Sequence, residues 1–207
     1  MLRPFVTGSQ GAAPRDLGVL GLALDVNNRG QTVGFTLEDI SRPFLVDKSG
    51  QFHFLGALPG GLSAGASAIN DFGQVAGSSL VGGVIGEHAF LSAPNGGALR
   101  DLGTLGGIYS HATDVNNLGQ VVGFSSFEGS FRNHAFVSAP DGGALTDLGV
   151  LSPATMSYAY VINDAGVILA RVRRTAGTRH SSTPQRKACR LLTASSIPPW
   201  ASTSTPR

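Results

Sequence analysis

The sequence predicts an all-β protein built from tandem four-stranded antiparallel units, arranged as in a β-propeller. Three observations predict this fold. An Asn-x-x-Gly motif recurs at Asn27, Asn70, Asn116 and Asn163, with successive spacings of 43, 46 and 47 residues. Each period contains short runs in which apolar and polar residues alternate, as in half-buried strands. Turn-forming residues separate these runs.

Near-copies of one segment define the repeat boundaries within residues 1–170. The segment His88-Ala89-Phe90 recurs 46 residues later as His134-Ala135-Phe136. Two earlier copies open at Arg3 and Arg42. The four tandem units therefore span approximately residues 3–41, 42–87, 88–133 and 134–170.

The third unit shows why each run is expected to be a strand. Its runs are residues 88–93, 98–102, 111–116 and 120–126. Pro94-Asn95-Gly96 joins the first two, because proline presets a turn, asparagine tolerates its second corner and glycine accepts positive φ. Asn116 and Gly119 join the last two, as in a type I turn followed by a left-handed glycine. We expect the repeated asparagines to cap their own turns through side-chain hydrogen bonds to the backbone, rather than to bind sugar.

Equivalent apolar positions are expected to form a core between neighbouring units, because one four-stranded unit cannot bury its apolar faces alone. Burial of one phenylalanine contributes about 1.5–3 kcal/mol. The expected core positions are Phe5, Phe44, Phe90 and Phe136; Leu17, Leu55, Leu102 and Leu148; Val26, Ile69, Val115 and Ile162; and Val33, Ala76, Val122 and Leu169.

Two questions of architecture stay open at this level. A β-solenoid is the alternative fold, but hairpin turns favour antiparallel pairing whereas solenoid coils usually pair in parallel. The sequence does not decide whether four units close into a ring or form a segment of a larger one. An open segment would expose apolar faces at both ends and would associate.

The composition fits an all-β repeat array, with 29 glycines among 207 residues and only 14% charged residues. We expect no membrane span, because no run of about 18 apolar residues is present. The single cysteine, Cys189, leaves no partner for an intrachain disulfide.

Charge is divided sharply along the chain. Residues 1–170 contain 7 Lys and Arg and 13 Asp and Glu, whereas residues 171–207 contain 8 Lys and Arg and no acid. We expect residues 171–207 to be a basic, disordered tail rich in Ser, Thr, Pro and Arg. Three interpretations remain: an inert extension, a segment that contacts nucleic acid or acidic lipid, or an out-of-frame translation of GC-rich coding sequence.

Histidines invite a search for metal or catalytic chemistry. His88 and His134 stand where the first two units have Arg3 and Arg42. Because a guanidinium cannot replace imidazole as a metal ligand, we expect a structural polar pair at this position. The expected carboxylate partners are Asp16, Asp101 and Asp147.

The remaining histidines, His53, His111 and His180, do not provide the paired spacings of zinc sites. His111 and Asp114 lie three residues apart in an expected strand, so they should point to opposite faces and not form a general-base pair. Nucleophile-elbow, metalloprotease and phosphate-loop motifs are absent from the sequence. We therefore assign no catalytic, cofactor-binding or metal-binding residues and expect no cofactor.

Three segments together resemble the bacterial HAF repeat family across approximately residues 3–170. They are His-Ala-Phe at 88–90 and 134–136, Asp-Leu-Gly at 101–103 and 147–149, and Asn-Asn-Leu-Gly-Gln-Val-Val-Gly at 116–123. The resemblance implies an extracellular or cell-surface protein with no established enzymatic activity. The first two units depart from the family in lacking His-Ala-Phe. We expect no signal peptide, because Met1-Leu2 leads directly into the first strand.

The expected function is that of a non-enzymatic extracellular repeat protein, a binding or structural module. Its expected partners are cell-surface polysaccharide or protein, and not nucleic acid. One alternative is a propeller-type carbohydrate-active enzyme or lyase, for which Asp71, Asp114 and Asp164 are the nearest carboxylates, although we expect their turns on the outer part of each unit. A second alternative is a truncated, frameshifted fragment without independent function.

Overall fold

The computed structural model describes residues 2–8, 11–82, 86–130, 132–174 and 190–192 of the 207-residue chain. Apart from two short 3-10 turns at Pro94–Gly96 and Pro140–Gly142, the regular elements of these residues are β-strands. The expected all-β class is confirmed. Neighbouring strands within each sheet are antiparallel, which argues against the β-solenoid.

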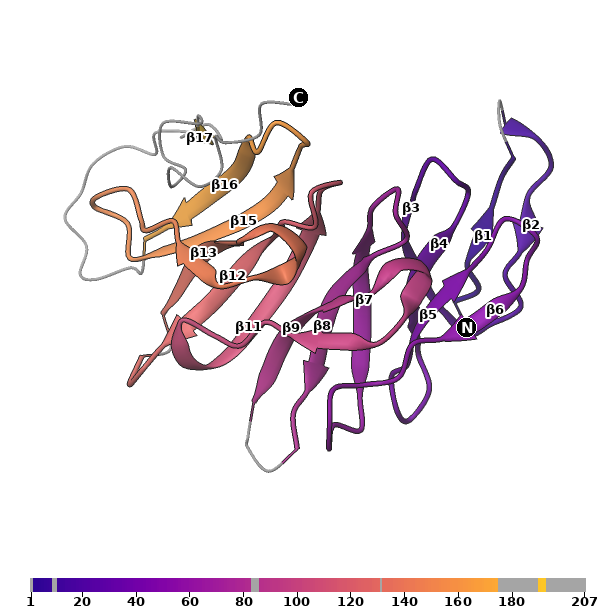
Figure 1. Cartoon of the computed structure of the whole chain (residues 1–207), viewed down its shortest axis with the longest axis horizontal. Helices are drawn as coiled ribbons and strands as arrows, with labels where there is room; N and C mark the ends of the chain where they lie inside the picture. The colour runs from indigo at the N-terminus through magenta and orange to yellow at the C-terminus, as the bar shows by residue number, and fades with distance from the viewer. Residues whose placement is uncertain (1, 9–10, 83–85, 131, 175–189, 193–207) are drawn as a thin grey trace, which may run out of the picture.

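Three successive four-stranded sheets form the body of the molecule (Figure 1). Sheet 1 contains β3 (Gly21–Val26), β4 (Thr32–Thr36), β5 (Pro43–Val46) and β6 (Phe52–Phe54). Sheet 2 contains β7 (Ala64–Ile69), β8 (Val75–Leu80), β9 (Glu87–Ser92) and β10 (Leu99–Asp101). Sheet 3 contains β11 (Gly106–Val115), β12 (Val121–Phe127), β13 (Asn133–Ser138) and β14 (Leu145–Asp147). One parallel pair, Tyr109 with Glu87, links sheets 2 and 3.

Smaller sheets lie at the two ends of this series. Strands β1 (Phe5–Val6) and β2 (Arg15–Asp16) form a two-stranded sheet. Sheet 4 contains β15 (Met156–Ile162), β16 (Ile168–Arg173) and β17 (Arg190–Leu192). Figure 1 shows β1–β2 and sheet 4 at opposite ends of the longest axis, with sheets 1 to 3 between them.

The sheets are out of phase with the sequence units. Sheet 2 joins the end of the unit expected at 42–87 to the start of the unit at 88–133. The physical reason is that each His-Ala-Phe strand pairs with the strand before it, as Phe90 pairs with Gly77. Four strands per period are confirmed, but each sheet begins near the third run of a unit.

The expected tail boundary at residue 171 is also corrected. Strand β16 continues through Arg173, and β17 pairs with its edge, opposite Ile168–Ala170. The rest of the expected disordered tail, residues 175–189 and 193–207, lies outside the described residues.

The core lies between the sheets, and the repeated phenylalanines dominate it. Phe44, Phe90 and Phe136 are completely buried. Phe90 packs into a cluster with Val33 and Leu45 of sheet 1, so each phenylalanine fills the space against the preceding sheet. Most of the other expected core positions are buried or half-buried.

The prediction of burial is wrong for two of the expected core residues. Phe5 is 63% exposed and Val26 is 53% exposed. Both lie at the N-terminal end of the series: no described sheet precedes β1–β2, and the sheet that precedes Val26 consists of β1 and β2 only. Their exposure shows that position in the repeat is not sufficient for burial, because the neighbouring sheet supplies the other half of each core cluster.

The turn chemistry follows the sequence closely. Asn95 and Asp141 adopt φ of 57° and 53°, and the glycine that follows each of them also has positive φ. Gly73 has φ of 75°, and a Cβ added there would lie 2.9 Å from the backbone nitrogen of Asn95. Glycine is therefore required at position 73 both by conformation and by the close approach of a second turn.

A recurrent irregularity was not predicted by the two-residue period. In β3, β7, β11 and β15 the register shifts by one residue, at Leu24, Ser67, Thr113 and Tyr160. Such bulges leave one residue unpaired and change the direction of the following side chains. Here they precede the Asn-x-x-Gly turns and help to direct the residues described below.

We predict that Phe90→Ala lowers the free energy of unfolding by about 3–5 kcal/mol, because it leaves a cavity between sheets 1 and 2. Phe5→Ala is the matched control and should cost less than about 1 kcal/mol, because Phe5 is exposed. Urea denaturation followed by far-ultraviolet circular dichroism measures both. Equal losses in the two variants would contradict the packing described here.

A polar groove at the repeated turns

The Asn-x-x-Gly turns come together on the inner side of the sheet series. They join the first and second strands of each sheet, and the first strands β3, β7, β11 and β15 lie against one another. A groove of about 190 Å³ opens at these turns. Its lining residues are Val26, Asn27, Asn28, Ile69, Asn70, Asp71, Val115, Asn116, Asn117, Ile162 and Asp164.

This placement corrects the expectation for the three candidate carboxylates. Asp71 and Asp164 line the groove instead of lying on the outer part of each unit. Asp114 precedes the lining residue Val115 and contacts the adjacent sheet. The error follows from the phase of the sheets, because the turn expected on the outside connects the two innermost strands.

The repeated asparagines cap their own turns, as expected, and also connect neighbouring sheets. The Oδ1 atom of Asn70 accepts hydrogen bonds from the backbone nitrogens of Phe72 and Gln74, both at 3.0 Å. Its Nδ2 donates to the carbonyl of Asn116, at 2.9 Å. The same bridge runs from Asn27 to Asn70 at 2.9 Å and from Asn116 to Asn163 at 3.1 Å.

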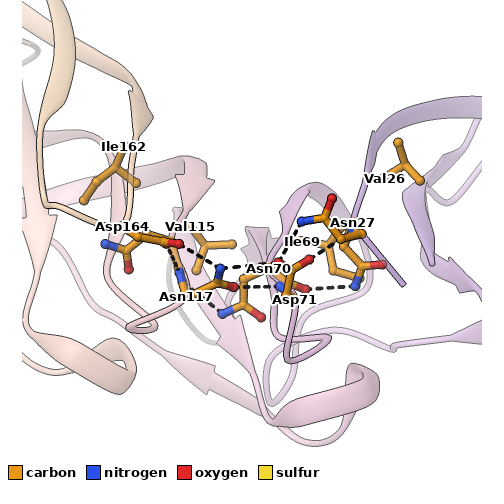
Figure 2. Close-up of a pocket in the computed structure, with 11 residues that line it drawn as sticks. Val26, Asn27, Ile69, Asn70, Asp71, Val115, Asn117, Ile162 and Asp164 are labelled. Atoms are coloured by element: carbon orange, nitrogen blue, oxygen red, sulfur yellow. Dashed lines mark hydrogen bonds between the residues drawn. The ribbon is translucent and has the colours of Figure 1, made fainter. Parts of the chain in front are cut away.

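A second row lies beside the first and alternates amide with carboxylate (Figure 2). Both Asn28 nitrogens donate to the carboxylate of Asp71, at 2.8 and 2.9 Å. The backbone nitrogen of Asp71 donates to Oδ1 of Asn117 at 2.9 Å, and both Asn117 nitrogens donate to Asp164 at 2.8 and 2.9 Å. The order Asn, Asp, Asn, Asp therefore places a donor opposite an acceptor at each of the three sheet boundaries.

These hydrogen bonds affect the charge of the groove. They lower the pKa of Asp71, chiefly through the side chain and the backbone nitrogen of Asn28. Asp71 therefore remains ionised to a lower pH than an ordinary aspartate. The groove presents a fixed negative charge at neutral pH.

Two further carboxylates clamp the first strands of neighbouring sheets. Asp25 accepts from the backbone nitrogens of Val26 and Ile69, each at 2.8 Å. Asp114 accepts in the same way from Val115 and Ile162, each at 2.8 Å. Both oxygens of each carboxylate are thus used by the backbone.

Burial raises the pKa of Asp114, and the nearby charge of Asp25 adds to the increase. The hydrogen bonds from Ile162 and Val115 oppose this effect. A raised pKa beside a groove is one property of catalytic acids. A raised pKa also occurs in structural carboxylates. Because Asp114 accepts two backbone hydrogen bonds, its role here is structural.

The predicted histidine pairs are confirmed, and they lie outside the groove lining. Nδ1 of His88 lies 2.9 Å from Asp101, and Nδ1 of His134 lies 3.0 Å from Asp147. In the first unit Arg3 contacts Asp16 at 2.8 Å. The second unit has no carboxylate at the equivalent position, and Arg42 instead lies over the ring of Phe54, at 5.7 Å from its centroid.

His111 and Asp114 contact different sheets and do not form a general-base pair, although the bulge at Thr113 breaks the strict alternation from which the sequence argument started. Nδ1 of His111 lies 2.6 Å from Ser78 Oγ, in sheet 2, whereas Asp114 reaches Ile162 in sheet 4. Glu87 lies 3.8 Å from the same Nδ1 atom. Because serine and glutamate approach one nitrogen, the three residues do not form a relay through both ring nitrogens.

No group of three or more His, Cys, Asp or Glu residues suited to a metal ion occurs in the described part of the chain. His53 is exposed on β6, and His180 falls outside the described residues.

The residues that the sequence did not single out are Asn28, Asn117 and Asp25. A signal for the first two was present, because the second position of the repeated Asn-x-x-Gly motif reads Asn, Asp, Asn, Asp. For Asp25 no signal was available, since its role depends on a bulge and on the backbone of another sheet.

No protein-family model matches this sequence, and no curated protein is similar to it. The crystal structure of TolB from Acinetobacter baumannii, a β-propeller protein, is similar, with a TM-score of 0.52 and 13% sequence identity. The likeness covers 81% of this chain and 45% of the TolB chain, so this chain spans less than half of that protein. At this identity the likeness concerns the fold alone.

A membrane-spanning helix is not found in the described residues, because none of their helices is long and apolar enough.

We predict that Asn70→Asp lowers the free energy of unfolding by about 1–3 kcal/mol, because an oxygen replaces Nδ2 and faces both the carbonyl of Asn116 and Oε1 of Gln74. Asn163→Asp is the matched control, since the structure shows no acceptor for Nδ2 of Asn163 among the described residues. Its effect should be within about 0.5 kcal/mol. Thermal and urea unfolding measure both, and equal effects would contradict a bridging role.

We predict a pH-dependent stability that involves His111. Burial lowers the pKa of this histidine, and the charge of Glu87 partly opposes the shift. Folding therefore favours the neutral ring, and stability is present above the unfolded pKa of about 6.5 and is lost as the pH falls towards the folded pKa. His111→Gln should flatten the decrease in unfolding free energy between about pH 7.5 and 5.5.

His53→Gln is the control, because it removes a histidine whose side chain is exposed on β6. The carboxylates with lowered pKa, Asp47 and Asp71, lose their contribution only near or below about pH 4, outside the window measured. An identical slope in wild type and His111→Gln would contradict the prediction.

Proposed function

We propose that this protein is a partial β-propeller of the HAF repeat type that acts as a non-enzymatic extracellular binding module. The single observation that carries the proposal is the row of alternating amides and carboxylates along the groove. The repeating antiparallel sheets and the likeness to TolB support the propeller architecture. The extracellular location rests on the resemblance of the repeats to that family.

The groove chemistry favours binding over catalysis. Asp25 and Asp114 use both carboxylate oxygens to hold backbone nitrogens, so proton transfer by either would disturb contacts between sheets. Asp71 has a lowered pKa, which suits an ionised acceptor rather than a general acid at neutral pH. These groups are arranged to accept hydrogen bonds.

A hydroxyl-rich polysaccharide is the ligand class that this groove fits best. Amides offer donors and acceptors, and carboxylates offer strong acceptors, so together they match hydroxyl groups, which do both. Among the apolar lining residues only Val26 is exposed, at 53%, whereas Ile69, Val115 and Ile162 are each 5% exposed. Contact with a ligand therefore depends mainly on the polar side chains of the groove. At about 190 Å³ the groove is smaller than the ~300–1,000 Å³ typical of sites that enclose a small molecule. It therefore suits part of a polymer.

One observation favours a second candidate, a carbohydrate-active enzyme. Asp114 has a pKa raised by burial and lies next to the groove, as expected of a general acid. In this candidate the neighbouring Asp71 carboxylate, whose pKa is lowered, would be its ionised counterpart.

We predict that immobilised polysaccharides retard the protein in affinity electrophoresis or chromatography, and that it binds soluble oligosaccharides in isothermal titration calorimetry. No reducing ends should be released from the polysaccharide. Asp71→Ala should weaken the affinity about tenfold or more, since it removes a charged acceptor from the groove. Asp47→Ala is the matched control, because Asp47 caps the β5–β6 turn and does not line the groove.

Three outcomes would contradict this proposal. One is the absence of binding across a panel of neutral and charged polysaccharides. Another is equal weakening by Asp71→Ala and Asp47→Ala. Turnover of a polysaccharide that Asp114→Asn abolishes would replace the binding module with the enzyme.

A further inference from the structure

The two ends of the sheet series carry complementary halves of one sheet. In β1–β2 the pair Phe5 with Asp16 corresponds to Phe90 with Asp101 in β9–β10. Strands β1 and β2 are therefore the third and fourth strands of a sheet. Strands β15 and β16, joined by the turn at Asn163, are the first and second strands of a sheet.

The exposure of Phe5 marks a surface that the other sheets bury. Phe5 is 63% exposed, whereas Phe44, Phe90 and Phe136 are all at 0%. In the complete sheets each of these phenylalanines lies on a strand that pairs with a second strand, as Phe90 pairs with Gly77. β1 pairs with β2 only, so the strand edge next to Phe5 has no partner among the described residues.

A matching apolar cluster lies at the other end of the molecule, where sheet 3 packs against sheet 4. Phe136 packs in a cluster that includes Ala89, Leu91 and Leu102 of the preceding sheet. The residues 46 positions later, Ala135, Val137 and Leu148, also cluster, but that cluster contains no phenylalanine among the described residues. These three residues are where the repeat would place a phenylalanine from the completed sheet 4.

The polar rows point to the same match. Nδ2 of Asn163 has no acceptor among the described residues, whereas the equivalent atom of Asn116 reaches the next asparagine carbonyl. At the opposite end, the carbonyl of Asn27 accepts from its own turn, at Gly30, and receives no asparagine side chain from the residues that the structure describes. In the three existing bridges, Nδ2 of one repeated asparagine donates to the carbonyl of the next. The same arrangement would make Nδ2 of Asn163 the donor and the carbonyl of Asn27 the acceptor of a fourth bridge.

We propose that the β1–β2 hairpin of a second copy of this chain completes sheet 4, in the order β15, β16, β1, β2. Existing sheets set the register: Val33 faces Leu45, Ala76 faces Leu91 and Val122 faces Val137. Leu169 of one copy therefore faces Val6 of the other, and Ala170 faces Phe5. The two copies associate head to tail, with the interface that already recurs between the sheets of one chain.

A second copy is favoured over the chain's own hairpin because β1–β2 and sheet 4 lie at opposite ends of the molecule (Figure 1). Strand β17 pairs with the same edge of β16 at three positions. In sheets 2 and 3 the equivalent edge is paired at five positions. β17 is thus a weaker competitor that the hairpin of the second copy displaces.

Disulfide cross-linking of the full chain tests the register. In a Cys189→Ser background, Val6→Cys and Leu169→Cys should form disulfides between copies on mild oxidation, because cross-strand neighbours lie within disulfide reach. Covalent dimers or longer species on a non-reducing gel are expected. Val6→Cys with Val161→Cys is the control, since Val161 lies on β15, two strands from β1 in the completed sheet.

Each outcome of this experiment decides the proposal. Disulfides between copies in the first pair, and not in the control, support it. A monomer with an internal disulfide would show ring closure within one chain and would overturn the second copy. No disulfide in either pair, or equal yields in both, would overturn the register.

Sedimentation velocity provides an independent measurement on the unmodified chain. Phe5→Asp should weaken self-association about tenfold or more, because the residue is exposed in the single chain and buried only in the completed sheet. An unchanged circular dichroism spectrum would show that the single chain still folds. Leu191→Pro should strengthen association, since proline disrupts the pairing of β17 with β16.

Self-association that is unchanged by Phe5→Asp, or weakened by Leu191→Pro, would contradict the proposal. Neither measurement involves polysaccharide, so a failure of the self-association proposal can be told apart from a failure of the proposed binding function.

Discussion

The structure depends on one constraint: a four-stranded sheet with two apolar faces is stable only when its neighbours cover them. The buried phenylalanines are the largest side chains of this core, but hydrophobic contact is non-directional and does not by itself set how two sheets are staggered. The hydrogen bond from each repeated asparagine to the next asparagine carbonyl supplies that direction. Because the same amide caps its own turn, turn geometry and sheet placement are coupled.

The groove follows from this coupling. Asn-x-x-Gly turns that must bridge neighbouring sheets are brought together at the inner strands, and their second residues form a continuous row. Polar atoms that remain available after the structural hydrogen bonds face solvent there. A binding surface therefore arises from residues whose first task is to hold the sheets, which explains why charged groups such as Asp114 have structural partners.

Positions that vary between sheets contrast with this constant framework. His111, paired with Phe124, corresponds to Gly65 paired with Ser78 and to Tyr158 paired with Arg171. The same place in the fold thus holds residues of different chemistry. The contact between His111 and Ser78 has the residue types of a catalytic pair, yet its geometry, with Glu87 at the same ring nitrogen, is that of a local polar cluster.

Much of the fold could be predicted from the sequence, because its signals are local. The Asn-x-x-Gly and Pro-x-Gly turns specify backbone conformations that only a few residues adopt. The structure has positive φ at Gly73 and Gly96, as predicted, and also at Asn95 and Asp141. Strand alternation and the repeat period gave the number of strands in each period. The pairing of His88 with Asp101 was visible because a second unit repeats it.

The candidate site was less predictable, because its geometry joins residues more than 40 positions apart. Asp71 and Asp164 were identified, but they were assigned to the outside, since a repeat has no natural starting point and its phase depends on which strands pair. The bulges that direct Asp25 and Asp114 leave no clear sequence signal.

The sequence by itself determined the strands, the turns and the identity of the repeated core residues, because these depend on local conformation and on alternation. Only the tertiary structure decided which strands share a sheet, which turns line the groove, and why Phe5 is exposed while Phe90 is buried. The physical reason is that burial and hydrogen-bond partners in this array come from the neighbouring sheet.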